Sequence, residues 1–293
     1  MKKFGAFLLA KDSNAIIVAF LAALLPMFYI PTGIVAVLVV GLVTFQKGPK
    51  SGFWLLTWVA LPAIALMVLR EFGLVDVLLL RCAIIWIFAS LMYRTQSWAL
   101  ILSCLAVVGV AAVAVVHWRF PGVQAWWVTH LSSYFEKIMA DSRWKTNVSP
   151  KEFINYVAPI ATGLTAFFFA AGIFIELVVA RFWQSVTMDS HIFGDAFVRI
   201  RMNVVAVLAI SILIAFCFFK KWIALDMLPI ALFPFCIAGL SLLHSWVRKN
   251  RQLIYLLIAT YVGLLLVPVM IVSLLSLLAV SDVWFDFRNL KIG

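Results

Sequence analysis

Residues 97–116 read SWALILSCLAVVGVAAVAVV and contain no charged side chain. An uninterrupted apolar run of about 20 residues is the length that an α-helix needs to cross the hydrocarbon core of a membrane. The whole 293-residue chain has a similar character, because 66% of its residues are hydrophobic and 12% are charged. Soluble domains are about half apolar and about a quarter charged, so this composition argues against a soluble, disordered or disulfide-stapled fold. We therefore predict an all-α, polytopic helical membrane protein.

Nine apolar segments follow one another along the chain. They are residues 14–30, 33–46, 53–69, 73–93, 97–116, 153–180, 203–219, 226–247 and 252–280. As a helix, 33–46 would reach only about 21 Å, against a hydrocarbon core about 30 Å thick, so it either crosses the membrane or re-enters it. We therefore predict eight or nine transmembrane segments in a single integral membrane domain over residues 1–293.

Residues 117–150 form the longest connection between these segments. Val123, Trp127 and Leu131 recur there at four-residue spacing, with polar residues between them. This spacing predicts an amphipathic helix, which either lies in the head-group plane of the membrane or forms a lid over an outward-facing cavity.

The formal net charge of +11 comes from Lys and Arg residues that lie mainly between the apolar segments. This distribution predicts attraction to anionic membrane lipids rather than binding of nucleic acid. If all nine segments cross, the positive-inside rule places the N-terminus in the cytoplasm.

Signatures of enzymes and of metal or cofactor sites are absent from the sequence. The four cysteines lie inside apolar segments without a C-x-x-C pair, and the four histidines are scattered. No phosphate-binding loop, dinucleotide fingerprint, zinc-protease motif or nucleophile elbow occurs. We predict no catalytic residue, no metal and no cofactor, and keep a polytopic enzyme as the third hypothesis.

Charged residues inside the predicted spans are the candidates for an intramembrane polar site: Asp76, Arg81 and Glu176. Burying such a charge in hydrocarbon costs on the order of 3 kcal/mol. Asp76 and Arg81 share a helix face poorly, so Arg81 needs a partner on another helix. Glu176 can pair with Arg81 or with Arg181. Such a pair either locks two helices together or binds a substrate carboxylate or an ion.

Small residues form a ridge on the first helix, because Ala15, Ala19 and Ala23 recur at four-residue spacing. A row of small side chains lets another helix approach closely.

Two polar stretches flank the later spans. The elbow segment, residues 181–202, either lies in the membrane interface with snorkelling arginines or docks a partner protein. Its candidate residues are Arg181, Trp183, Gln184, Phe193, Phe197, Arg199 and Arg201. The C-terminal motif either locks the terminus to basic residues of another segment or forms a ligand site. Its residues are Asp282, Phe285, Asp286 and Arg288.

The runs LVVARFWQSV at 177–186, FGDAFVRIRM at 193–202 and SDVWFDFR at 281–288 resemble the YybS-like family of bacterial membrane proteins, whose activity is unassigned. The resemblance covers most of the chain and implies a multi-pass protein of the bacterial inner membrane. The family is distantly similar to the substrate-binding components of energy-coupling vitamin transporters. Those components dock on a coupling subunit through a ridge of alanines at four-residue spacing, a pattern that Ala15, Ala19 and Ala23 match.

Two functions are consistent with these features. The first is a transport-related membrane protein that holds a small-molecule solute between its helices. The second is a non-transporting scaffold or assembly factor that binds a membrane or cytoplasmic protein through residues 181–201.

Overall fold

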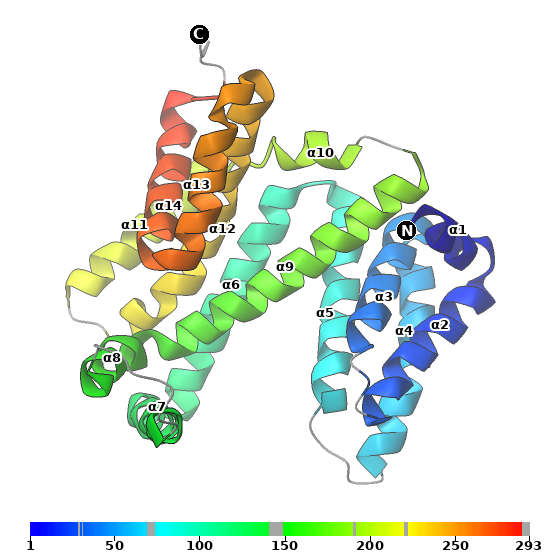
Figure 1. Ribbon diagram of the computed structural model, residues 1–293, viewed down its shortest axis with the longest axis horizontal. Helices are drawn as coiled ribbons and strands as arrows, with labels where there is room; N and C mark the ends of the chain where they lie inside the picture. Colours follow the sequence, from blue (N-terminus) through cyan, green and yellow to red (C-terminus); the bar gives the residue numbers. More distant parts are fainter. Residues whose placement is uncertain are drawn as a thin grey trace. The chain divides into compact units, whose positions relative to one another are not determined.

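The computed structural model describes residues 1–28, 30, 32–68, 74–140, 149–189, 192–219 and 222–288. Every regular element in these ranges is a helix (Figure 1). The chain divides into two compact units. Unit 1 comprises Met1–Ile101 and Ala171–Phe197, and unit 2 comprises Leu102–Ala170 and Val198–Gly293.

Unit 1 is built mainly from the N-terminal helices and the second part of α9. Its helices are α1 (Lys2–Ala10), α2 (Asp12–Leu24), α3 (Gly33–Lys47), α4 (Pro49–Val68), α5 (Leu74–Thr95), the end of α9 (Ala161–Thr187) and α10 (Ile192–Phe197). Within the unit, α2 packs against α3 and α4, and α3 also packs against α5.

The turn between α3 and α4 positions the first residues of α4. Gly48 has a φ of +90°, a conformation that side-chain-bearing residues rarely adopt, and its N–H bonds the Thr44 carbonyl at 3.0 Å. Pro49 follows as the first residue of α4, where a missing N–H leaves no hydrogen bond unmade. The Gly-Pro pair therefore ends one helix and starts the next without a longer loop.

Unit 2 contains the remaining helices. They are most of α6 (Trp98–Arg119), α7 (Val123–Ala140), α8 (Pro150–Val157), the start of α9, α11 (Val204–Phe218), α12 (Trp222–Lys249), α13 (Ile254–Leu266) and α14 (Pro268–Phe285). Its core includes Cys236, Leu240 and Leu243 of α12, packed with Leu275 of α14. The connection at 117–150 contains the expected helix, α7.

Five stretches of helix in the described residues are long and apolar enough to cross a membrane. They are Val77–Thr95, Trp98–Arg119, Lys151–Thr187, Ile223–Lys249 and Pro268–Phe285. The helices α1 and α2 would form a sixth span together, but they are bent by 113°. The prediction of eight or nine spans is therefore not confirmed, because several apolar runs form shorter helices.

Residues 252–280 show why fewer helices are long enough to cross a membrane than the sequence predicts. In the sequence, this run counts as one apolar segment. It forms α13 and α14, with a break at Val267 before Pro268. Proline cannot donate the helical hydrogen bond and its ring clashes with the preceding turn, so α14 starts anew at Pro268.

Candidate functional site

Arg81 of α5 and Glu176 of α9 form an ion pair inside unit 1. An Nη2 hydrogen of Arg81 is donated to Oε1 of Glu176. The Glu176 side chain is 4% exposed and that of Arg81 is 34% exposed. The two charges are therefore in direct contact, with the carboxylate sealed inside the unit. Asp76, the third residue predicted for this site, has a side chain outside the described residues.

The carboxylate of Glu176 is only half satisfied. Its Oε2 atom is buried and has no hydrogen-bond partner among the described residues. Gly172 lies one turn earlier on α9, and a Cβ there would stand 3.4 Å from Arg81 Nη2. The guanidinium of Arg81 thus lies next to the space that a larger side chain at position 172 would fill.

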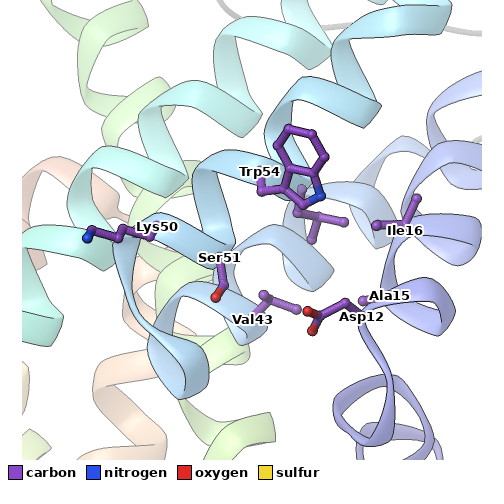
Figure 2. A pocket seen from close by; sticks show the side chains of 8 residues that line it. Asp12, Ala15, Ile16, Val43, Lys50, Ser51 and Trp54 are labelled. Carbon is purple, nitrogen blue, oxygen red and sulfur yellow. The ribbon is translucent and has the colours of Figure 1, made fainter.

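A pocket lies elsewhere in unit 1, between α2, α3 and the start of α4 (Figure 2). Its volume is about 250 Å³. Its lining combines polar and apolar side chains: Asp12, Lys50, Ser51 and Trp54 with Ala15, Ile16, Val43 and Leu55. The Oδ1 atom of Asp12 accepts a hydrogen bond from Lys47 Nζ at 2.6 Å.

Sequence reasoning did not find this pocket. Its charged residues, Asp12 and Lys50, come from two charged interruptions of the apolar pattern, Lys11–Asp12 and Lys47–Lys50. Each interruption by itself is an ordinary helix end. The signal that could have linked them is their position at neighbouring ends of consecutive helices.

A second buried pair, a histidine beside a carboxylate, lies in unit 2. His117 Nε2 of α6 is 2.7 Å from Asp226 Oδ2 of α12, and their side chains are 8% and 1% exposed. The other carboxylate oxygen, Oδ1, accepts the backbone N–H of Gly163 at 2.6 Å. Gly163 lies near the start of α9, which continues directly from the 3-10 turn Ala158–Ile160. Asp226 therefore bonds the α9 backbone while it pairs with His117.

Asp226 is buried, at 1% exposed, although it lies at the edge of the apolar segment 226–247. The backbone of α9 approaches so closely that a Cβ on Gly163 would fall 1.5 Å from the Asp226 carbonyl oxygen. The glycine permits the contact that buries the carboxylate.

The first elbow residues face into unit 1. Arg181 donates to Gln184 at 2.6 Å and to Gln96 at 2.7 Å. Gln184 in turn donates to the Phe45 carbonyl at 2.9 Å. Trp183 is 5% exposed and stacks on Phe4, 5.9 Å between ring centroids. These side chains hold α9 to its neighbours in unit 1.

The other elbow residues are less uniform. The side chain of Phe193 lies outside the described residues, Phe197 is half-buried, and Arg199 is exposed. Arg201 instead points into a cluster with the C-terminal motif, where its Nη1 is 3.2 Å from Asp286 Oδ1. Of the elbow arginines, Arg199 is thus the exposed one.

The C-terminal cluster joins Arg288 to the segment before α11. Arg288 Nε donates to Asp282 Oδ2 at 2.9 Å, and Nη2 donates to the Ile200 carbonyl at 2.5 Å. Arg288 Nη1 and Arg201 Nη2 donate to the carbonyls of Val198 and Asp282. Phe285, from the same motif, is 70% exposed. These contacts hold the C-terminal motif against the segment before α11.

The alanine ridge lies inside unit 1. Ala15, Ala19 and Ala23 are at most 2% exposed, on the helix that packs against α3 and α4. Within unit 1 the ridge packs against neighbouring helices, and its docking on a second subunit stays a prediction. No group of three or more potential metal ligands occurs in the described residues.

No protein-family model, curated protein or solved structure matches the chain.

Proposed function

We propose that the protein is a transport-related integral membrane protein that binds a small solute between the helices of unit 1. The observation that carries this proposal is the pocket between α2, α3 and α4. It combines an acid, a base, a hydroxyl and an indole with an apolar floor. A few polar groups set in an apolar, concave surface are typical of small-molecule sites.

The Arg81–Glu176 pair takes a different role in this proposal. Glu176 is 4% exposed, so its carboxylate is closed off from a solute that approaches from outside the unit. An ion pair between α5 and α9 holds two helices that are distant in sequence. We therefore assign it to helix locking rather than to direct solute binding.

The contacts of the elbow make the scaffold hypothesis less favourable. Arg181, Trp183 and Gln184 are engaged within unit 1, and Arg201 is engaged within unit 2. The exposed residues left for a partner protein in the described part of the elbow are Phe182, Met188, Asp189, Gly194, Asp195 and Arg199. The inner-membrane location with a cytoplasmic N-terminus and the likeness to the YybS-like family stay predictions.

Native mass spectrometry of gently purified protein from several hosts tests the solute site. We expect a co-purified small molecule that is lost in Trp54→Ala, which removes a wall of the pocket. Trp118→Ala is the matched control, because Trp118 is 83% exposed and does not line the pocket. A protein that is free of ligand from every host, or a ligand retained equally in both variants, would overturn the proposal.

A further inference from the structure

The hydrogen-bond donors and the acceptor of the unit 1 pocket lie on different helices. Three hydrogen-bond donors lie on the first turns of α4: the Lys50 ammonium, the Ser51 hydroxyl and the Trp54 indole N–H. The acceptor is the carboxylate of Asp12, at the start of α2. Figure 2 shows Lys50 and Asp12 on opposite sides of Ser51, with the Lys50 ammonium extended away from the other labelled side chains. A ligand that satisfies both walls carries an anionic and a cationic group at separate positions.

The α4 wall suits a phosphate. Lys50 and Ser51 follow Pro49 in the first turn, where backbone N–H groups have no helical acceptor and the helix dipole is positive. Helix N-termini with a basic side chain and a hydroxyl are common phosphate-binding arrangements. Within the described residues, neither the Ser51 hydroxyl nor the Trp54 indole N–H donates a hydrogen bond, so both donors are available to a ligand.

The α2 wall suits a primary ammonium. Asp12 Oδ1 is bonded to Lys47, whereas Oδ2 accepts no hydrogen bond from the described residues. A carboxylate oxygen bonds an N–H donor strongly, and it repels a second anion. A head group with glycerol beside the phosphate lacks the cation, and a choline head group lacks the N–H donors. An ethanolamine head group has both.

The surroundings indicate a lipid. The pocket lies at helix ends that also carry Lys11 and Lys47, and Trp54 is of the residue type that concentrates at membrane–water interfaces. Its volume of about 250 Å³ is below that of pockets for drug-sized molecules, but it is adequate for a head group. Exposed apolar side chains continue along the same helices, including Ile17 and Leu21 of α2 and Leu61 of α4. Acyl chains can lie along them.

We infer that this pocket binds the head group of a phospholipid that carries a primary ammonium. The phosphate lies against Lys50 and Ser51 at the N-terminus of α4, and the ammonium lies against Asp12. The inference rests on the proposed function, since it names the class of ligand for the same site.

Lipid titrations of the detergent-solubilised full chain, followed by native mass spectrometry, test this inference. The probes are phosphatidylethanolamine, phosphatidylcholine and phosphatidylglycerol with identical acyl chains. We expect at least a fivefold preference for phosphatidylethanolamine over both of the others. Asp12→Asn should reduce this preference to less than twofold, and Asp12→Glu should keep part of it. Ser51→Ala should weaken the binding of all three lipids.

Asp189→Asn is the matched control. Asp189 is also an exposed aspartate of unit 1 that pairs with a lysine, Lys2, but it does not line the pocket. Its substitution removes the same charge and should leave the lipid preference unchanged. Thermal unfolding of each variant verifies that the protein remains folded. If Asp12→Asn does not fold, the lipid preference of Asp12→Glu still tests the inference.

The outcomes separate this inference from the proposed function. Equal binding of the three lipids, or a preference that survives Asp12→Asn, overturns the inference. If a different small molecule then depends on Trp54, the proposed function stands. Free phosphoethanolamine that displaces the lipid at equal concentration would overturn the lipid assignment in favour of a soluble zwitterion. If no bound mass depends on Trp54, both proposals are wrong.

Discussion

Glu176 in unit 1 and Asp226 in unit 2 are both almost fully buried carboxylates that pair with a base from another helix. They differ in their second oxygen. Asp226 Oδ1 accepts a backbone N–H from Gly163, whereas Glu176 Oε2 has no partner among the described residues. A buried polar atom without a partner costs about 1–3 kcal/mol, so the two pairs contribute differently to stability. The Asp226 pair fixes three helices, and the Glu176 pair depends on Arg81 alone within the described residues.

The largest expected effect comes from Gly163, the glycine beside the Asp226 pair. Gly163→Ala would place a Cβ 1.5 Å from the rigid carbonyl oxygen of Asp226. Overpacking typically costs about 1–3 kcal/mol and occasionally more. A Cβ that falls 1.5 Å from backbone exceeds this typical range, because the backbone cannot move aside as a side chain can. We expect little folded protein by fluorescence-detected size-exclusion chromatography.

Gly172→Ala is the comparison for that substitution. Its Cβ would stand 3.4 Å from Arg81 Nη2, at the flexible end of a long side chain. Alanine also favours a helix interior over glycine by roughly 0.5–1 kcal/mol, so this variant should remain folded. Similar yields for the two alanine variants would contradict the close contact between α9 and α12.

The second prediction concerns the dependence of Glu176 on Arg81. Arg81→Met leaves a buried carboxylate without compensation, which typically costs about 3–5 kcal/mol. The double variant Arg81→Met/Glu176→Leu removes both charges and should recover to within about 1 kcal/mol of the wild type, because apolar replacements of buried pairs are often neutral. Thermal unfolding in one detergent measures both. A double variant as unstable as the single one would show that the pair does not account for the loss.

A third prediction extends the comparison to Asp282, whose Oδ2 is bonded to Arg288 and whose Oδ1 has no partner among the described residues. Arg288→Ala removes this bond and those to the carbonyls of Val198 and Ile200. A hydrogen bond to a charged group contributes about 1.5–3 kcal/mol, so we expect a loss of about 2–3 kcal/mol in thermal unfolding. Arg199→Ala, at an exposed position, should stay within about 0.5 kcal/mol of the wild type. Equal losses of stability in the two variants would mean that the contacts of Arg288 do not stabilise the C-terminal cluster.

The helices were largely predictable from sequence, because apolar composition and proline positions are local properties. The break at Pro268 had its signal in the sequence, but the apolar run around it favoured a single helix. The partners of the buried charges were harder to predict. Arg81 and Glu176 lie 95 residues apart, and Glu176 could be named only as one of the residues able to pair.

The pair in unit 2 shows more clearly which contacts cannot be predicted from sequence. His117 and Asp226 are 109 residues apart, and no spacing in the sequence connects them. Their burial depends on the approach of α9, which Gly163 permits. Glycine alone in an apolar run does not indicate which backbone will come close. The pocket at Asp12 and Ser51 has the same origin, since it forms only when separate helix ends meet.

The smallest expected effect defines what an ion pair contributes when water surrounds it. Lys2 Nζ lies 2.5 Å from Asp189 Oδ2, and the two side chains are 56% and 72% exposed. Lys2→Ala should therefore cost only about 0.2–1 kcal/mol. At about 1 M salt, where the screening length falls to about 3 Å, the difference from wild type should disappear. The loss in Arg81→Met should persist at that salt concentration, because the Glu176 carboxylate is sealed from solvent ions. Thermal unfolding of both variants at low and high salt measures this contrast, and equal salt sensitivity would contradict the burial of Glu176.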